Sequence, residues 1–275
     1  MKTIEELKKI AVDVRVNIIK MITEAGSGHP GGSLSSVEIL LTLFFNKLQR
    51  NSQNALSPDR HRLILSKGHG VPALYAVLHE CGLISEEELM TLRKINSPLQ
   101  GHPDRVMLPY VEASTGSLGQ GLSIAQGMAM AAKLDRRQSR LYCLMGDGET
   151  QEGQVWEAIL SAGKYRLDNL TAILDANKAQ IDGLVKDVLD LQPIKDKLNA
   201  FHWHVIEIDG HDLTQIKEAL AEAENTKGKP TYIIANTIKG KGVSFMEADL
   251  VGWHGKAPTP QQAEAAIKEL TQSFN

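Results

Sequence analysis

The feature that most constrains the fold is a pair of apolar segments, each followed by a polar residue suited to a cation. Residues 141–145 lead into Gly146-Asp147-Gly148, and residues 170–174 lead toward Asn177, thirty residues after Asp147. Between them, residues 155–160 have the apolar spacing of a helix. This pattern predicts a βαβ unit, whose right-handed crossover places parallel strands side by side. Asp147 and Asn177 are then expected at the carboxyl edge of the sheet, where such folds bind ligands.

The residue types in this unit suit a metal-bridged diphosphate. Mg²⁺ prefers hard oxygen ligands and takes few protein carboxylates, with phosphates completing its shell. Asp147 offers a carboxylate and Asn177 an amide oxygen, and a backbone carbonyl shortly afterwards, for which Ala179 is the candidate, offers a third ligand. Gly146 and Gly148 let the backbone approach a phosphate, toward which the next helix directs its amides. Gly-Asp-Gly alone is as typical of an ordinary turn, so the prediction depends on the whole unit.

The same alternation of strands and helices runs through the chain. Thr3 and Glu6 form a capping-box pattern at the start of an amphipathic helix over residues 3–24. A helix over residues 34–46 is apolar almost all round, and we expect it to be buried or at an interface. Further helices are predicted over residues 71–78, 86–94, 121–134, 213–223 and 261–272, and further strands over residues 63–65, 205–208 and 231–235. This order predicts an α/β fold with a doubly wound, mostly parallel sheet and helices on both faces. The length fits one domain, residues 1–275.

Composition argues against several classes of function. A net charge of −3 and a pI near 6.3 give no footprint for binding nucleic acid. No apolar run approaches the length of a membrane span. Cys81 and Cys143 lack the spacing of a metal or redox site, and Cys143 lies in a predicted buried strand. This usage fits a reducing cytoplasm.

Five of the nine histidines lie beside a glycine: His29, His69, His102, His211 and His254. A lone histidine in a loop is more often a turn or capping residue than a catalyst, and His211, which opens a predicted helix, is assigned to that group. His202 and His204 lack the spacing of a zinc site and are interpreted as structural. The other four are distinguished by the motifs around them.

Four short motifs precede Gly-Asp-Gly in the chain: Gly28-His29-Pro30-Gly31, Ser66-Lys67-Gly68-His69, Gly101-His102-Pro103 and Gly116-Ser117-Leu118-Gly119-Gln120-Gly121. With the spacing of Asp147 and Asn177, their order resembles the diphosphate-binding domain of transketolases over nearly the whole chain. The resemblance implies a thiamine diphosphate-binding fold. It also implies thiamine diphosphate and Mg²⁺ as cofactors, with Ca²⁺ or Mn²⁺ as alternative metals.

The resemblance also implies roles for individual residues. His69 would contact the diphosphate, His29, His102 and His254 would face the sugar, and Glu152 would hydrogen-bond toward a glutamate of a partner subunit; these five form the expected catalytic set. Histidine suits the task because it titrates near neutral pH and can donate to a developing alkoxide. The expected metal ligands are Asp147, Asn177 and Ala179. The expected cofactor-binding residues are His69, Gly116, Ser117, Leu118, Gly146, Asp147, Gly148, Glu152, Asn177, Ile181 and His254. Glu149 and Thr150 differ from the commoner family residues, and we interpret that difference as neutral.

Transketolases place the cofactor between two domains, and the second, which binds the pyrimidine, is not seen in this sequence. We therefore expect the N-terminal subunit of a split transketolase, active only with a C-terminal, pyrimidine-binding subunit in an α2β2 assembly. It would transfer a two-carbon ketol unit between sugar phosphates, as in the pentose phosphate pathway. Two alternatives stay open: an α-type subunit of a 2-oxo acid dehydrogenase or deoxyxylulose-phosphate-synthase-like enzyme, and a non-catalytic partner that binds the cofactor. A nucleotide-binding module is disfavoured because neither a Walker Lys-Ser/Thr nor a dinucleotide fingerprint occurs.

Overall fold

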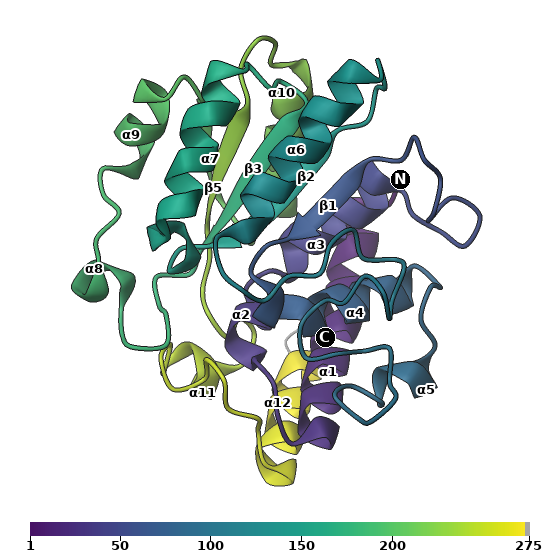
Figure 1. Cartoon of the computed structure of the whole chain (residues 1–275). Helices are drawn as coiled ribbons and strands as arrows, with labels where there is room; N and C mark the ends of the chain where they lie inside the picture. The colour runs from purple at the N-terminus through teal and green to yellow at the C-terminus, as the bar shows by residue number, and fades with distance from the viewer. Residues whose placement is uncertain (273–275) are drawn as a thin grey trace.

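A five-stranded parallel sheet forms the centre of the computed structural model, which describes residues 1–272 (Figure 1). Its strand order is β1-β2-β3-β5-β4, and every neighbouring pair is parallel. The strands are β1 (Arg62–Leu65), β2 (Leu141–Gly146), β3 (Leu170–Ala176), β4 (His204–Asp209) and β5 (Thr231–Asn236). The predicted α/β class and all five predicted strands are confirmed.

The βαβ unit predicted around residue 147 is present. Strands β2 and β3 are direct neighbours, joined through α7 (Gly153–Lys164), and Gly146 pairs with Asp175 in the register. Both strands therefore end at the same level of the sheet. This places Asp147 and Asn177 at one edge, as the strand–helix–strand pattern predicts.

Alternate residues of each strand face opposite layers of helices. In β2, Tyr142 and Leu144 pack into one core, while Cys143 and Met145 pack into the other. The first core includes residues of α1 (Ile4–Ala25), α3 (Val37–Thr42), α4 (Val71–Glu80), α10 (Leu213–Asn225) and α12 (Pro260–Gln272). The second includes residues of α6 (Gln120–Leu134), α7 and α9 (Ile194–Ala200). A strand that is buried on both faces needs a continuous apolar sequence, which is the pattern from which these strands are predicted.

The N-terminal segment contains one confirmed and one incorrect prediction. Helix α1 begins with the predicted capping box, in which Thr3 Oγ1 accepts from the Glu6 N–H at 3.2 Å and the Glu6 carboxylate accepts from the Thr3 N–H at 2.8 Å. The predicted start of the second helix at residue 34 is wrong, because α2 (Pro30–Leu34) ends there and α3 begins at Val37; α2 begins at Pro30, whose fixed φ suits the first helical position. From Val37 the helix continues without a break, as α3 and then as the π-helix η1 (Leu43–Leu48). It is mostly buried, as predicted.

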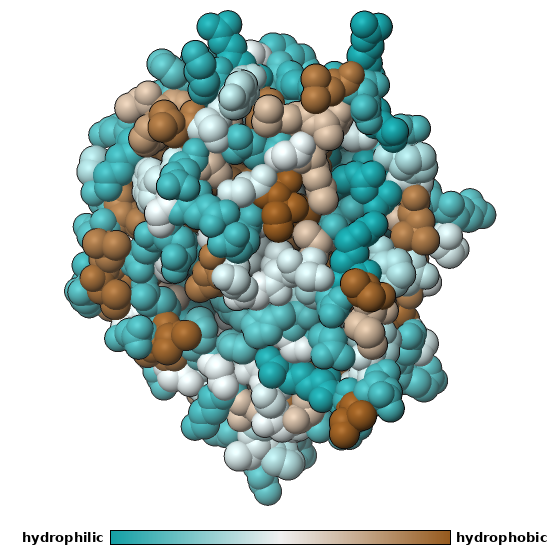
Figure 2. Space-filling view, viewed as in Figure 1, coloured by the Kyte–Doolittle hydropathy of each residue, from teal (hydrophilic) through white to brown (hydrophobic). Residues whose placement is uncertain are grey.

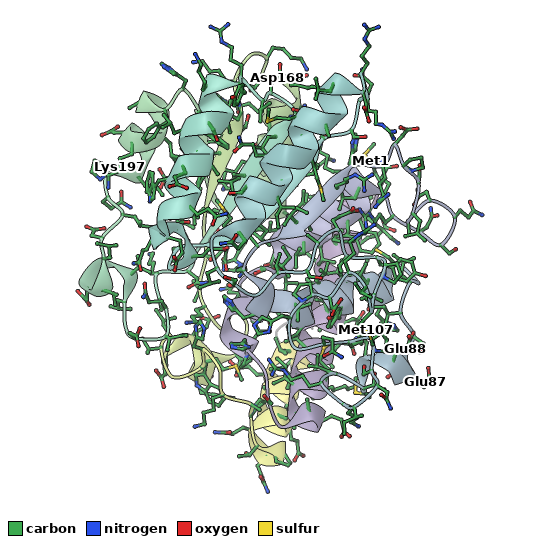
Figure 3. All side chains as sticks on the ribbon, viewed as in Figure 1. Met1, Glu87, Glu88, Met107, Asp168 and Lys197 are labelled. Carbon is green, nitrogen blue, oxygen red and sulfur yellow. The ribbon has the colours of Figure 1, made fainter. Side chains whose placement is uncertain are left out.

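Several short elements were missed or predicted too long. The surface helix expected over residues 86–94 is only α5 (Glu86–Leu89), and further along the chain Arg93 takes a positive φ. Figure 3 shows Glu87 and Glu88 directed outward. The short helices η2 (Gly68–Gly70), η3 (Glu149–Gln151), α8 (Val185–Val188) and α11 (Ser244–Glu247) lack a readable periodicity. None of the helices within residues 1–272 has the length and hydropathy needed to cross a membrane. Figure 2 shows the apolar side chains of one face as separate patches on a hydrophilic surface.

Candidate active site

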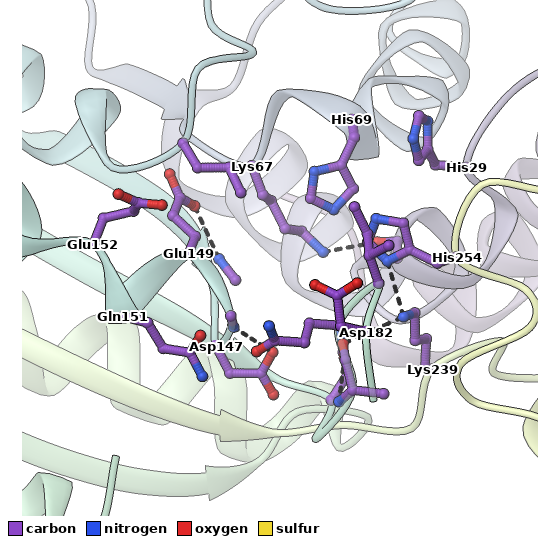
Figure 4. Close-up of a pocket in the computed structure, with 18 of the residues that line it drawn as sticks. His29, Lys67, His69, Asp147, Glu149, Gln151, Glu152, Asp182, Lys239 and His254 are labelled. Atoms are coloured by element: carbon purple, nitrogen blue, oxygen red, sulfur yellow. Dashed lines mark hydrogen bonds between the residues drawn. The ribbon is translucent and has the colours of Figure 1, made fainter. Parts of the chain in front are cut away.

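The carboxyl ends of four strands open onto one cavity of about 320 Å³ (Figure 4). Lys67 follows β1, Asp147 follows β2, Asn177 follows β3 and Lys239 follows β5, and all four line the cavity. The arrangement arises because parallel strands deliver all their following loops to the same edge. Residues from four distant parts of the chain thus meet around one space.

One side of the cavity carries the oxygen atoms expected for a metal. The Asp147 carboxylate accepts hydrogen bonds from the N–H groups of Gly148 at 2.9 Å and Lys178 at 2.5 Å. The Asn177 side-chain oxygen accepts from the Ala179 N–H at 3.3 Å, which holds the segment in a tight turn. Asp147, Asn177 and Ala179 therefore lie together and line the cavity.

The charge of Asp147 is poorly satisfied by the protein itself. Burial and then the nearby Asp175 raise the pKa of Asp147 to about 6, against the opposing effect of the backbone N–H donors. A bound cation would stabilise this buried carboxylate. Residues 1–272 contain no group of three His, Cys, Asp or Glu side chains placed to hold a metal. A single carboxylate with an amide and a carbonyl oxygen suits Mg²⁺ whose remaining ligands come from phosphate.

A second, fully buried carboxylate lies beneath this site. Asp175 accepts hydrogen bonds from four donors: Ser35 Oγ at 2.6 Å, Asn177 Nδ2 at 3.0 Å, Lys67 Nζ and Thr237 Oγ1. Although burial opposes the charge of Asp175, Lys67 and the hydroxyl donors lower its pKa below the usual value. The Asp175 carboxylate is therefore paired and acts as a support for the residues that reach the cavity.

Two buried lysines reach the cavity, and neither is among the site residues predicted from the sequence. Lys67 donates to the Gly32 carbonyl at 2.7 Å, in addition to Asp175. Lys239 Nζ lies 3.3 Å from the Ala179 carbonyl oxygen and 3.0 Å from Nδ1 of His254. Burial lowers the pKa of Lys239 to about 8. The available signals were the Ser66-Lys67-Gly68-His69 motif and the basic, glycine-containing segment 237–242.

The four histidines singled out by their motifs form one cluster. Their ring centroids are separated by 5.3 Å for His29–His69, 5.5 Å for His29–His254, 5.1 Å for His69–His254 and 6.1 Å for His29–His102. Burial, followed by nearby positive charge, lowers the pKa of His29 to about 4 and that of His254 to about 3. The pKa values of His69 and His102 are lowered for the same reason. The cluster therefore offers neutral imidazoles near neutral pH.

One ring nitrogen of His29 is buried and unsatisfied. Its Nδ1 has no hydrogen-bond partner among the described residues. In His254, by contrast, Nδ1 accepts from Lys239, which leaves the Nε2–H as a donor. An unsatisfied buried polar atom is costly to the fold.

Glu149, whose difference from the commoner family residue is not neutral as expected, is a central structural residue. Its buried carboxylate accepts from Ser66 Oγ and from the N–H groups of Gly119 at 2.9 Å and Gly146 at 3.1 Å. It therefore joins the ends of β1 and β2 to the loop before α6. The Glu149 carboxylate thus lies at the amino end of α6. There Ser66 Oγ also accepts a hydrogen bond from the Gly121 N–H at 3.1 Å.

The glycine-rich loop before α6 approaches the histidines closely. Gly116 has a φ of +154°, and a Cβ there would lie 3.2 Å from His102 Cγ. Gly116 and Leu118 line the cavity, whereas Ser117 is exposed and does not. Gly146 and Gly148 line it as well.

The last two predicted cofactor-binding residues, Ile181 and Glu152, line the cavity but are exposed. Ile181 is 65% exposed and lines the cavity beside Asp182. The Glu152 side chain is exposed and makes no hydrogen bond or ion pair within residues 1–272. It lies at the amino end of α7 without capping it.

The remaining histidines lie outside the cavity. His211 bonds to Glu38 and to the Ile238 backbone, and Asp212 rather than His211 caps α10. His204 pairs with Glu222 at 2.6 Å. Neither lines the cavity.

The comparisons of this chain with known proteins all indicate the same family. The sequence matches the family described as "Transketolase, thiamine diphosphate binding domain" over residues 7–273. It is 44% identical to a 6-deoxy-6-sulfo-D-fructose transketolase subunit of Clostridium sp. (strain MSTE9), covering 96% of this chain and 97% of the relative. It is 39% identical to an apulose-4-phosphate transketolase subunit of Phocaeicola vulgatus, covering 98% of this chain and 95% of that relative.

Longer relatives match over only part of their length. Human transketolase is 43% identical over 97% of this chain, which spans 42% of the human protein. The solved structure of Campylobacter jejuni transketolase superimposes with a TM-score of 0.91 at 34% identity, covering 98% of this chain and 43% of that one.

Proposed function

Because this chain belongs to the transketolase family, we propose that it is the diphosphate-binding subunit of a split transketolase, a transferase that moves a two-carbon ketol unit from a ketose to an aldose. The observation that carries this proposal is length. Two relatives whose names include the word subunit are covered over 97% and 95% of their length, whereas human transketolase is covered over 42%. The family match over residues 7–273 supports treating residues 1–275 as one domain.

We assign the metal to Asp147, the Asn177 side-chain oxygen and the Ala179 carbonyl. The support is that all three residues line the same cavity and that the buried carboxylate of Asp147 forms no ion pair within residues 1–272. Mg²⁺ suits a set with one carboxylate, because phosphate oxygens and water complete its shell. Ca²⁺ or Mn²⁺ would use the same oxygens.

The diphosphate would lie between the glycines and the buried cations. Gly116, Leu118, Gly146 and Gly148 line the cavity, and His69, Lys67 and Lys239 bring donors to it. When bound, thiamine diphosphate supplies the nucleophilic carbon for breaking and forming carbon–carbon bonds next to a carbonyl. The chain supplies positive charge and backbone proximity, which bind and orient it. Ser117 and Ile181 are both exposed, so we propose that they cover the bound cofactor from the outside.

The histidines would hold the sugar and its protons. His29, His102 and His254 carry lowered pKa values, so each is neutral near pH 7 and can both accept and donate. His29 lines the cavity, and its ring would meet a sugar hydroxyl or carbonyl group, while the Nε2–H of His254 would donate to a developing alkoxide.

The partner would be a pyrimidine-binding subunit in an α2β2 assembly. The carboxylate of Glu152 supports this, since it is exposed and has no hydrogen-bond or ion-pair partner within residues 1–272, which leaves it able to hydrogen-bond across an interface. The named relatives act on a sulfonated sugar and on a sugar phosphate, which supports an anionic sugar as substrate here. We place the enzyme in the cytoplasm, where its two free cysteines would stay reduced, and in sugar-phosphate exchange of the pentose phosphate type.

The experiment that tests this proposal mixes the purified chain with the product of the adjacent open reading frame, Mg²⁺ and thiamine diphosphate. Ketol transfer and 2-oxo acid decarboxylation are then assayed side by side. We expect ketol transfer only when both chains are present. Decarboxylation instead would identify the 2-oxo acid dehydrogenase alternative, and cofactor binding without turnover would identify a non-catalytic partner. Ketol transfer by this chain alone, unchanged by any partner, would contradict the split arrangement.

A further inference from the structure

Outside the cavity, three polar side chains from distant parts of the chain form a buried cluster. Arg15 of α1 and His211, which follows β4, both bind the carboxylate of Glu38 in α3, at 2.7 Å and 3.0 Å. The exposed fractions of the three side chains are only 8%, 13% and 10% for Arg15, His211 and Glu38. We call this set the Arg15–Glu38–His211 cluster. Burying such a cluster costs desolvation energy, and burial alone is weak support for a role in stability.

Arg15 and His211 also hydrogen-bond to the backbone of one loop, residues 238–241. His211 Nε2 accepts from the Ile238 N–H at 2.9 Å, and Arg15 Nε donates to the Lys241 carbonyl at 3.1 Å. These two contacts lie immediately before and two residues after Lys239. A single carboxylate, Glu38, thus connects the two supports of the segment that carries Lys239.

Each hydrogen-bonding group in the cluster has a defined direction. The backbone N–H of Ile238 can only donate, so His211 Nε2 accepts, and the Glu38 carboxylate can only accept, so His211 Nδ1 donates. Burial alone would raise the pKa of Glu38, but Arg15 and His211 outweigh burial and lower that pKa below its usual value. The charged Glu38 therefore fixes both the ring of His211 and the guanidinium of Arg15.

The loop needs such support because its own sequence favours many conformations. Gly240 and Gly242 take φ values of +79° and +93°, and residues 240–242 are part of a glycine-containing turn. Its other hydrogen bonds include the Gly240 N–H to the Gly31 carbonyl at 3.0 Å, the Thr237 hydroxyl to Asp175 and the Gly242 N–H to the Glu247 carboxylate at 2.8 Å. Lys239 itself must extend its buried side chain between the Ala179 carbonyl and His254.

We propose that Arg15, Glu38 and His211 are positioning residues that hold the backbone on both sides of Lys239 and so place its ammonium group between the metal-side carbonyl of Ala179 and the sugar-side His254. This inference rests on the proposed function, because it takes Lys239 to bind the cofactor's diphosphate. None of the three residues lines the cavity. They act on the ligand only through Lys239.

Two conservative variants each remove one support and keep the contact with Glu38. Arg15→Lys keeps the positive charge near Glu38 but has no Nε to reach the Lys241 carbonyl. His211→Asn keeps a donor near the Nδ1 position and loses the acceptor for Ile238. His204→Asn is the matched control, because it removes a second His–Glu pair, with Glu222, that does not touch the loop. All are made in the full chain and assembled with the partner subunit.

The decisive measurement is Mg²⁺–thiamine diphosphate affinity in a double-mutant cycle with Lys239→Met. We expect Arg15→Lys and His211→Asn each to weaken binding about 3- to 10-fold when Lys239 is present, the effect of losing one hydrogen bond. In the Lys239→Met background the same variants should change the affinity less than about 2-fold, because the residue they position is gone. His204→Asn should leave affinity unchanged in both backgrounds.

Equal losses in the two backgrounds would overturn the proposal, since they would show that the cluster acts on folding or on the cavity as a whole. Melting temperature is recorded for each variant, and Glu38→Gln, which keeps the shape of Glu38, replaces any variant that fails to fold. If the wild-type assembly binds no Mg²⁺–thiamine diphosphate, the proposed function fails instead. Crystal structures then decide the inference, because residues 238–241 should move in Arg15→Lys and His211→Asn but not in His204→Asn.

Discussion

The Asp175 carboxylate accepts a hydrogen bond from Nδ2 of Asn177 at 3.0 Å. Because a carboxylate only accepts, this contact decides which end of the Asn177 amide faces the protein interior. The amide oxygen is left on the side of Ala179 and the cavity. A residue that never touches the ligand thus orients one that is proposed to bind the metal, as is common for the groups behind metal ligands.

We predict that Asn177→Asp destabilises the chain through this contact. A second carboxylate would lie beside Asp175, in place of a donor, and like charges at such a distance repel. The free energy of unfolding should fall by about 2 kcal/mol at pH 8. The difference should shrink at pH 5, where protonation of the new pair relieves the repulsion. Urea denaturation of wild type, Asn177→Asp and Asn177→Ala at both pH values checks this; a pH-independent loss would argue against repulsion.

Asp147→Asn should separate stability from cofactor binding. The folded-state pKa of Asp147, about 6, lies above its ordinary 3.8, so its charge opposes folding at pH 7.5 when no metal is present. Removing the charge should raise the free energy of unfolding of the metal-free chain by about 1–2 kcal/mol, the lost N–H acceptor offsetting part of the gain. Calorimetry should show Mg²⁺-dependent cofactor affinity falling at least about 10-fold. Unchanged affinity would remove Asp147 from the metal site.

The lowered pKa of His29 predicts a defined pH dependence of stability. Between its ordinary pKa of 6.5 and the folded value of about 4, the unfolded chain binds the proton and the folded chain does not. Stability contributed by neutral His29 is therefore lost as pH falls through this window, by about 1.4 kcal/mol per pH unit at most. Asp147 contributes with the opposite sign, because its folded pKa is raised.

Comparing wild type with His29→Asn cancels the contribution of Asp147, which both proteins share. The wild type should lose stability more steeply between pH 6.5 and 4 than the variant, as measured by denaturation at half-unit steps. Parallel curves would show that His29 is not buried as a neutral ring. In the assembled enzyme His29→Asn should lower ketol transfer while cofactor affinity stays near wild type.

Glu149→Ala should affect both the fold and the cofactor site. The substitution leaves Ser66 Oγ and the N–H groups of Gly119 and Gly146 without their shared acceptor. We expect a loss of about 2–4 kcal/mol in the free energy of unfolding. Glu149→Gln, which keeps one acceptor oxygen, should lose less, and since burial raises the pKa of Glu149, its neutral replacement is tolerated better than truncation. Equal losses in the two variants, by thermal unfolding, would show that the acceptor is unimportant.

Local sequence determined much of this protein. The apolar segments at 141–145 and 170–174 predicted adjacent parallel strands, and with them the meeting of Asp147 and Asn177. The motifs around His29, His69, His102 and His254 marked residues whose rings lie within a few ångströms of each other. Such predictions succeed because backbone geometry imposes a period on side chains and because parallel strands share one functional edge.

What only the tertiary structure decided is which charged groups meet. Glu38 and His211 are 173 residues apart, and nothing in the sequence around either one indicates that they are in contact. The sequence left Glu149 as a neutral difference and Lys239 as part of a basic loop, because neither residue has a local period or spacing that indicates burial. Their roles follow from desolvation, which depends on everything packed around them: a buried charge requires partners, and the fold alone supplies them.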